Sequence, residues 1–227
     1  MEIIRLTRSQ LRQADQIAIG FYGIPGILLM ENAARNLSKI VHEACNACPS
    51  RIVIVCGSGN NAGDGYAAAR HLSNLGHSIR IVVLKPIDQL QGDARLMADI
   101  ANKMWLEMVH DPDAISSDCD VIIDAIFGTG LSRTPEGTFA KVIEQINRID
   151  AKVHRVAVDI PSGLDCDTGI PMGVAVKAHQ TVTFLAEKVG FSRPEASIYT
   201  GKITVVDIGA PVEVIQKVQT AFHSLPT

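Results

Sequence analysis

The sequence predicts an α/β domain with a mostly parallel sheet that helices cover on both faces. Apolar runs rich in branched residues alternate with segments of helical periodicity, the pattern of βαβ units. The clearest run, Ile52 to Val55, indicates a parallel strand buried on both faces. It leads into Gly57 to Gly65, where glycines and small polar residues indicate a ligand loop. Ligands of such folds bind beyond the carboxyl ends of the strands, so the polar loops there are expected to decide function.

The other elements follow in alternation. A capping box at Thr7 to Gln10 begins a first helix, Gly20 to Gly23 ends it, and Pro25 opens a second helix with a broad apolar face. After the glycine loop, a helix is expected over Tyr66 to Leu75. Further strands are expected over 78–84, 106–109, 120–127, 153–160, 180–185 and 202–208, and further helices over 92–103 and 137–149. The residues after Ile208 suffice for one more helix.

Composition limits the classes of function. With 227 residues, 47% of them hydrophobic, the chain can bury one sizeable core, and a single domain over residues 1–227 is expected. Its 21 basic and 24 acidic residues form no long run, so we expect a small-molecule partner, with no nucleic acid and no membrane. The five cysteines are scattered, and neither a signal core nor an apolar run of the ~20 residues of a membrane span is present. We therefore expect a cytoplasmic protein.

Three polar loops follow expected strands and place acid, amide or hydroxyl groups among glycines: 57–65, 124–133 and 159–165. The first contains a G-x-G-x-x-A pattern, which some dinucleotide-binding enzymes carry. The second strand, however, ends near Lys85 where those enzymes have an acid for the ribose hydroxyls. No Tyr-x-x-x-Lys pair is present either, so an ordinary NAD(P)-dependent oxidoreductase is disfavoured. No Gly-Lys-Ser/Thr ends the loop, which excludes a P-loop.

The loops share hard oxygen donors in the Asn61 amide, the Asp124 carboxylate and the Ser162 hydroxyl. Hard cations choose such ligands. With only one carboxylate in the set, a monovalent cation is at least as plausible as magnesium. A weakly charged set of ligands offsets less of the free-energy cost of dehydrating a divalent ion. The alternative is that these groups cap helices and turns.

Five motifs in one order resemble the NAD(P)HX epimerase family, also called the YjeF N-terminal domain. They are Tyr22 to Pro25 with Leu29 to Ala33, Asn60 to Gly65, Asp124 to Gly130, Val158 to Gly163, and Thr181 to Phe184 with Lys188 and Gly190. The similarity covers nearly the whole chain. It implies a Rossmann-like three-layer αβα sandwich and a nucleotide-binding isomerase of metabolite repair. Such an enzyme interconverts the R and S epimers of NADHX and NADPHX, NAD and NADP cofactors hydrated at C6 of the nicotinamide ring. A separate ATP- or ADP-dependent NAD(P)HX dehydratase is then the downstream partner, and a homodimer is expected.

The resemblance also assigns residues position by position. It implies metal binding, with potassium (K+) on Asn61, Asp124 and Ser162. It implies substrate contacts on Asn60, Asn61, Ala62, Gly63, Asp64, Gly128, Thr129, Gly130, Leu131, Ser132, Arg133, Thr134 and Asp159.

Five positions carry particular expectations. Asp159, at a strand end, is the expected general acid and base. Lys188 is expected to hold a phosphate or to face solvent, and the alternative is that it acts electrostatically on Asp159. Asp64 is expected either to cap the helix after its loop or to bind substrate. Ala62 stands where the family usually has glycine, and it is expected to strain a left-handed position by ~1 kcal/mol or more. His179 stands where an aspartate is usual.

A function of another class uses the same fold, which also serves as a non-catalytic interaction and dimerisation module in messenger-RNA decapping scaffolds. Those modules lack intact site motifs. Here Asn61, Asp124, Asp159 and Ser162 are all present, so the enzyme is favoured.

Overall fold

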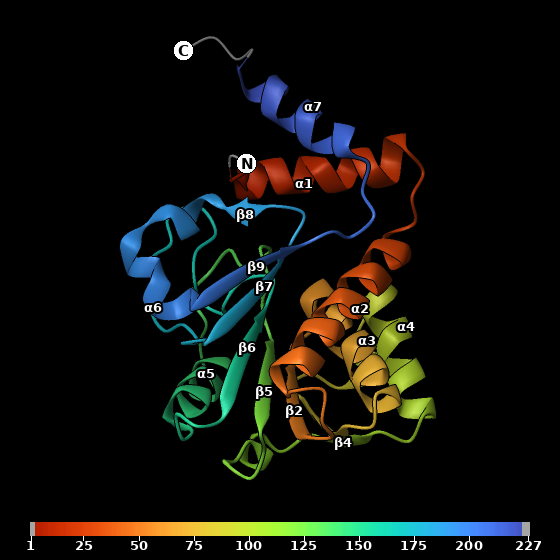
Figure 1. The fold of residues 1–227 in the computed structure, drawn as a ribbon, viewed down its shortest axis with the longest axis vertical. Helices are drawn as coiled ribbons and strands as arrows, with labels where there is room; N and C mark the ends of the chain where they lie inside the picture. The colour runs from red at the N-terminus through yellow and green to blue at the C-terminus, as the bar shows by residue number, and fades with distance from the viewer. Residues whose placement is uncertain (1–2, 224–227) are drawn as a thin grey trace.

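The structure, a computed structural model, describes residues 3–223 and is built around a seven-stranded sheet (Figure 1). The strand order is β4-β3-β2-β5-β6-β7-β9, and every neighbouring pair is parallel. In that order the strands span Glu107–Val109, Ser78–Val83, Arg51–Cys56, Val121–Ala125, His154–Val158, Gln180–Phe184 and Lys202–Val206. The predicted parallel α/β fold is confirmed. The chain order reverses between β2 and β5, which makes their carboxyl ends the topological switch point.

Helices cover both faces of the sheet. Helices α2, α3 and α4 pack on one face and α5 on the other, while α1 and α7 lie across the end of the molecule (Figure 1). The helices span Arg8–Gln16 (α1), Gly26–Ala44 (α2), Asn60–Asn74 (α3), Gly92–Lys103 (α4), Thr138–Arg148 (α5), Ser197–Thr200 (α6) and Val212–His223 (α7). The capping box predicted at Thr7 is confirmed, because its hydroxyl accepts the Gln10 backbone N–H while the Gln10 side chain accepts that of Thr7.

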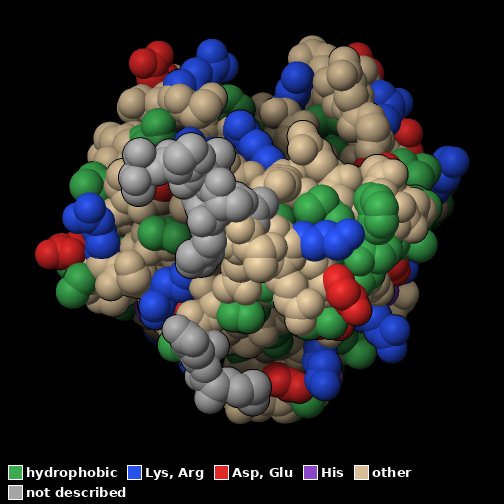
Figure 2. Space-filling view, turned by 90° about the horizontal axis from the view of Figure 1, so that it is seen from above, with side chains coloured by type: hydrophobic (Ala, Val, Ile, Leu, Met, Phe, Trp, Pro, Cys, Tyr) green, Lys and Arg blue, Asp and Glu red, His purple; other side chains and the backbone are tan. Residues whose placement is uncertain are grey.

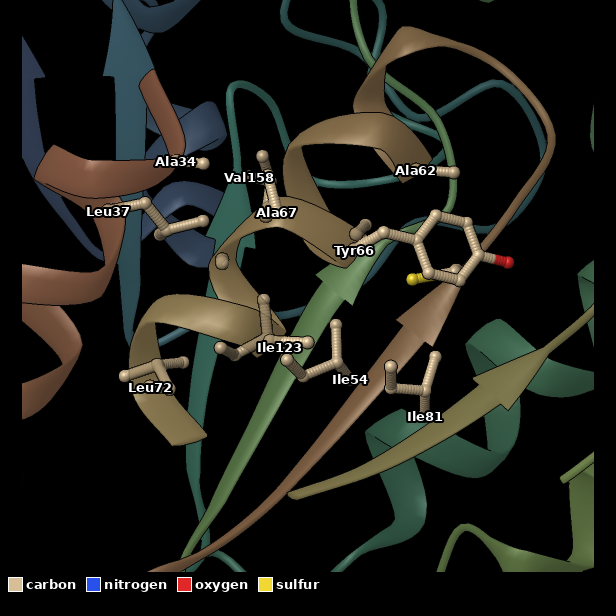
Figure 3. Packing of buried hydrophobic residues seen from close by; sticks show 14 of the residues in the cluster. Ala34, Leu37, Ile54, Ala62, Tyr66, Ala67, Leu72, Ile81, Ile123 and Val158 are labelled. Atoms are coloured by element: carbon tan, nitrogen blue, oxygen red, sulfur yellow. The ribbon is translucent and has the colours of Figure 1, made fainter. Parts of the chain in front are cut away.

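Branched residues of the sheet and small residues of α3 form the main core. Ala67 and Leu72 of α3 face Ile54 and Ile123 of the sheet, and Leu37 reaches the same cluster from α2 (Figure 3). All five side chains are fully or almost fully buried. Strands rich in branched apolar residues suit a sheet that is covered on both faces.

Helix α3 begins at Asn60, so the prediction of a helix starting at Tyr66 is wrong. The glycines that indicated an extended loop instead permit close packing. A Cβ at Gly57 would lie 2.1 Å from the carbonyl oxygen of Ile126, and one at Gly65 would lie 2.6 Å from Cβ of Ala125. Neither glycine has a positive φ. The glycine-rich segment therefore lets the first turns of α3 settle against the carboxyl ends of β2 and β5.

Ala62 lies inside α3 and is fully buried. It is not among the residues with positive φ, so the strain expected at this position is absent. A methyl group is compatible with a helical backbone here, which explains how alanine occupies a position where glycine is usual.

A short second ladder ties the start of the chain to the segment after β7. Strand β1 (Arg5–Leu6) pairs in parallel with β8 (Glu187–Lys188), so Leu6 lies opposite Lys188. The sequence does not indicate this ladder, because two-residue strands have no measurable periodicity. Its consequence is that the backbone of Lys188 is fixed by hydrogen bonding.

The outer surface mixes charges of both signs. On the face turned towards the viewer in Figure 2, basic and acidic side chains are interspersed, and apolar side chains lie in small groups between them. No helix among the described residues is long and apolar enough to cross a membrane.

Candidate active site

A pocket of about 560 Å³ lies at the switch point, at the carboxyl ends of β2, β5 and β6. The start of α3 and the loop after β5 form two of its walls, and side chains of α1 cover it from above. Most of the expected substrate residues line it: Asn60, Asn61, Asp64, Gly128, Thr129, Gly130, Leu131, Ser132, Arg133 and Asp159. Ala62, Gly63 and Thr134 stand outside the lining, because the first two point into the packing of α3 and Thr134 lies against Gly173.

Asp124 and Ser162 form one hydrogen-bonded unit beneath this pocket. The Ser162 hydroxyl donates to Asp124 Oδ1 at 2.5 Å, and the Ser162 backbone N–H donates to Oδ2 at 2.8 Å. The same hydroxyl accepts the Phe127 backbone N–H at 2.8 Å. Because Asp124 is 1% exposed and Ser162 is fully buried, the loops after β5 and β6 are joined through a carboxylate that water does not reach.

The donor set fits a weakly charged cation. No basic side chain is paired with Asp124 in the described part of the chain, and burial raises the pKa of this carboxyl to about 6. The buried Asn61 amide nitrogen has no hydrogen-bond partner among the described residues, and the Asn61 Oδ1 lies beside Gly128. Three or more His, Cys, Asp or Glu side chains do not come together as a metal cluster anywhere in residues 3–223. One carboxylate among neutral oxygens thus fits a monovalent ion better than a divalent one.

Asp159 forms a buried ion pair with Lys188. The Lys188 Nζ lies 2.6 Å from Asp159 Oδ1, and the lysine side chain is 1% exposed. Lys188 also donates to the Phe184 carbonyl at 3.2 Å. The expectation that Lys188 faces solvent is therefore wrong, and its ammonium group serves the carboxylate of Asp159.

The backbone of Asp159 is in a sparsely populated conformation. Its φ is 65°, a left-handed value that aspartate tolerates better than bulky residues do. The Asp159 N–H donates to the Val182 carbonyl at 2.7 Å, which holds the turn after β6 against β7. Strained backbone of this kind clusters at functional sites, where the surrounding structure keeps a side chain in place.

Asp64 is a second buried acid on the pocket wall. It is 8% exposed, and no hydrogen bond or ion pair to its side chain occurs among the described residues. Burial raises the pKa of Asp64 well above its ordinary value, and the nearby Asp159 and Asp15 raise it further. Of the two roles expected for Asp64, capping is not found, since the N-cap of α3 is Gly59 without a side-chain cap.

Helix α1 contributes Arg12 and Asp15 to the pocket, and neither residue was predicted from the sequence. Both fall on the polar side of an amphipathic helix, which by pattern alone is a solvated face. The only signal in the sequence is the charge of these residues, and it does not distinguish a pocket from solvent.

Anionic groups of a ligand have two places to bind. The start of α3 turns its free backbone amides towards the pocket from Gly59 and Asn60, and Arg133 adds a guanidinium group from the loop after β5. His179, where the family usually has aspartate, lies elsewhere: its Nδ1 accepts the Arg155 backbone N–H at 3.0 Å, outside the pocket.

A parallel α/β sheet with an acid-lined pocket and a helix N-terminus at its switch point defines a class of proteins that bind phosphate-bearing small molecules. Within that class, the chain belongs to the family described as YjeF-related protein N-terminus, which matches residues 26–190. It is 34% identical to the NAD(P)H-hydrate epimerase of Rhodopirellula baltica over 96% of this chain and 89% of that protein. It is 41% identical to the enzyme of the same name from Limosilactobacillus fermentum, over 89% of this chain and 95% of that protein.

Two further similarities extend the comparison. A bifunctional NAD(P)H-hydrate repair enzyme of Moorella thermoacetica is 37% identical over 92% of this chain, which spans 41% of that longer protein. The crystal structure of the yeast protein ynu0 superposes with a TM-score of 0.82 at 20% identity, covering 95% of this chain and 93% of the yeast chain. The latter similarity supports the fold alone.

Proposed function

We propose that this protein is an NAD(P)H-hydrate epimerase, an isomerase that interconverts the R and S epimers of NADHX and NADPHX. The observation that carries the proposal is the buried Lys188–Asp159 pair at the switch-point pocket. Relatives that bear this activity in their names share 34% and 41% identity over most of the chain. No structural observation favours the alternative of a non-catalytic interaction module, whose site would not need a buried ion pair in an open pocket.

The reaction inverts C6 of a hydrated nicotinamide ring. The bond from C6 to its hydroxyl oxygen must break and form again on the other face, and the leaving oxygen needs a proton. Asp159 is the proposed proton carrier, since it lines the pocket at the end of β6 and Lys188 holds its carboxylate in place. Positioned acid and base groups contribute typically ~10²- to 10⁴-fold to such steps.

The diphosphate of the cofactor is proposed to lie at the start of α3. The backbone amides near Asn60 and the side chain of Arg133 supply the donors and positive charge for it. This position directs the nicotinamide end towards Asp159 on the neighbouring wall of the pocket. The loop from Gly128 to Arg133 then covers the substrate from the side of β5.

Asn61, Asp124 and Ser162 are proposed to hold K+. The ion would compensate the buried charge of Asp124 and fix the loops that follow β2, β5 and β6 relative to one another. The role of the ion would be electrostatic and structural, because the Asp124–Ser162 unit lies beneath the pocket and not in its lining.

Two partners complete the proposal. Epimerisation repairs no cofactor by itself, so a separate ATP- or ADP-dependent dehydratase is proposed to consume one epimer, and the bifunctional repair enzymes among the relatives are consistent with that pairing. We also propose a homodimer, for which exposed Phe21 and Leu28 offer apolar side chains. Light scattering at several protein concentrations tests the dimer.

Chiral separation of the two NADHX epimers tests the activity. The purified protein, incubated with R-NADHX alone, is expected to produce S-NADHX until the two epimers reach equilibrium, much faster than buffer does. A rate equal to that of buffer in the presence of K+ would refute the proposal. A parallel incubation with R-NADPHX shows which of the two cofactors is preferred.

A further inference from the structure

Two carboxyl groups enter the pocket from different elements. Asp159 follows β6, whereas Asp64 belongs to α3, which follows β2. Strand β5 lies between β2 and β6 in the sheet, and both acids line the pocket at the carboxyl ends of these strands. A ring bound between Asp64 and Asp159 would have a carboxyl group on either side.

The two acids have opposite environments. Asp159 is paired with Lys188 at 2.6 Å and accepts the Phe184 backbone N–H at 3.3 Å, so it enters a reaction as a carboxylate. Asp64 is more than nine-tenths buried, and the described part of the chain gives it neither a cation nor a hydrogen-bond donor. A carboxyl group in such surroundings is held in its neutral form. The raised pKa of Asp64, caused first by burial and then by the nearby Asp159 and Asp15, agrees with this assignment.

Inversion at one carbon can use one group of each kind, an acid on the face that loses the hydroxyl and a base on the face that gains it. We infer that Asp64 is a second catalytic residue, which donates a proton to the leaving hydroxyl on one face of the ring while Asp159 accepts the proton of the incoming water on the other. This inference rests on the proposed epimerase function. It divides the role of general acid and base between Asp64 and Asp159, whereas the sequence predicts that Asp159 performs both parts.

The step balances without a further reactant. The Asp64 proton moves to the oxygen on C6, the C6–O bond breaks with its electron pair, and water leaves as the N1 lone pair forms the N1=C6 bond. A second water adds to C6 from the opposite face, the N1=C6 electron pair returns to N1, and one proton of that water passes to the Asp159 carboxylate. Exchange with solvent then returns Asp64 and Asp159 to their starting states. The reverse reaction uses the same two groups with their roles exchanged, as microscopic reversibility requires.

Oxygen exchange in H₂¹⁸O separates the two roles. The wild-type protein is expected to place ¹⁸O in the inverted epimer. Asp64→Asn and Asp159→Asn are each expected to lower inversion ~10²- to 10⁴-fold. Asp159→Asn should still exchange ¹⁸O into one epimer without inverting it, because Asp64 can expel water and return another on its own face. Asp64→Asn should lose exchange into that same epimer.

Thermal unfolding checks that each variant is folded. At position 64 an amide has the same shape and the same zero charge as a neutral carboxyl group.

Asp113→Asn, an exposed acid far from the pocket, is the matched control and is expected to match wild type. A folded Asp64→Asn protein that inverts within a factor of two of wild type overturns the role of Asp64. The role of Asp64 is also overturned if Asp64→Asn and Asp159→Asn both exchange ¹⁸O into the same epimer. It is overturned again if Asp15→Asn loses inversion while Asp64→Asn keeps it. Retention of ¹⁶O in the inverted product of wild type overturns the water-leaving step. Wild-type protein that inverts nothing refutes the epimerase proposal itself, which distinguishes the two failures.

Discussion

Lys188 Nζ lies 2.6 Å from the carboxylate of Asp159, and the lysine side chain is 1% exposed while that of Asp159 is 12% exposed. Two features hold the lysine there: the β1–β8 ladder fixes its backbone, and the Phe184 carbonyl accepts from its ammonium group. Removing two charges from water is costly, and a pair with good geometry repays most of that cost. Losing one partner leaves the other charge buried without compensation.

Lys188→Met is therefore expected to lower the free energy of unfolding by about 3–5 kcal/mol, the range for breaking a buried pair. The double variant Lys188→Met/Asp159→Asn should lose less than the sum of the single variants, because no charge is then left unpaired. Urea denaturation of the four proteins measures this coupling. Arg148→Met is the control, since the Arg148–Glu144 pair is exposed and its loss should cost below about 1 kcal/mol. Equal costs at the buried and the exposed pair would contradict the argument.

Asp159→Asn is expected to remain folded, although less stable because Lys188 loses its buried counter-ion, and to lose ~10²- to 10⁴-fold in epimerisation rate. The amide still has an oxygen for the Phe184 N–H, and Lys188 keeps its carbonyl acceptors at Phe184 and Ala186, but an amide cannot accept and release a proton as the carboxylate does. Chiral chromatography of NADHX measures the rate and circular dichroism the fold. A variant within a factor of two of the parent would move the proton transfer to another group.

Potassium is expected to stabilise the fold, and more strongly above about pH 6 than below it. Burial raises the pKa of Asp124 from its ordinary 3.8 to about 6, so without a cation the folded state binds this proton more tightly than the unfolded state does. Stability is consequently lost as the pH rises from about 4 to about 6, where the carboxylate becomes charged. An ion on Asp124 offsets that loss, by about 2.7 kcal/mol at a concentration a hundredfold above Kd.

Melting temperatures in potassium chloride and in the chloride of a large organic cation, at equal ionic strength, measure this effect across the pH range. In Asp124→Asn the difference between the two salts should vanish at every pH. A potassium effect that is the same at pH 5 and pH 8, or that persists in Asp124→Asn, would place the ion elsewhere.

Gly57→Ala is expected to destabilise the protein by about 1–3 kcal/mol or more, because the new Cβ would lie 2.1 Å from the backbone oxygen of Ile126, which cannot rotate away. Gly59→Ala, two residues further along the same segment, meets nothing within 4 Å and should change stability little. Chemical denaturation of both variants compares them directly. If both variants lost a similar free energy of unfolding, the glycines would be required for backbone freedom and not for close packing between the ends of β2 and β5.

The main sheet was predictable because the two strands at the switch point contain continuous apolar runs, Ile52 to Cys56 and Val121 to Ile123, and helices separate most of the strands along the chain. The switch-point position of the site followed from the polar loops after those strands. The start of α3 was not predictable in the same way. Glycines that allow close packing and glycines that allow positive φ look alike in a sequence, and only contacts such as that of Gly57 with Ile126 distinguish them.

The electrostatic organisation of the site was the feature least predictable from the sequence. Lys188 stands between Glu187 and Val189, a local pattern that does not indicate a buried ion pair, yet its backbone pairs with β1 and its ammonium group lies against Asp159. Asp15 reaches the pocket because α1 lies across the end of the sheet, a tertiary arrangement with no local signal. Motif order identified the acids Asp64 and Asp159, but their different environments depend on contacts between segments far apart in the chain.

The 227-residue chain is expected to equilibrate the epimers without regenerating NADH or NADPH. Dehydration driven by ATP needs a nucleotide site with positive charge at the γ-phosphate, and the start of α3 offers no lysine or arginine between Gly57 and Gly65. The switch-point pocket is already assigned to the hydrated cofactor, and the other hollow of note among the described residues, between Asn32 and Gly209, holds Arg35 and Lys39 without a glycine loop. The bifunctional repair enzyme of Moorella thermoacetica is matched over 41% of its length, which leaves most of that protein for a second activity.

A mixture of the protein, R-NADHX and ATP should therefore yield both the R and the S epimer, with no recovery of absorbance at the reduced nicotinamide band. Addition of a dehydratase should restore that absorbance. Recovery that depends on ATP and on this chain alone would reveal a second active site.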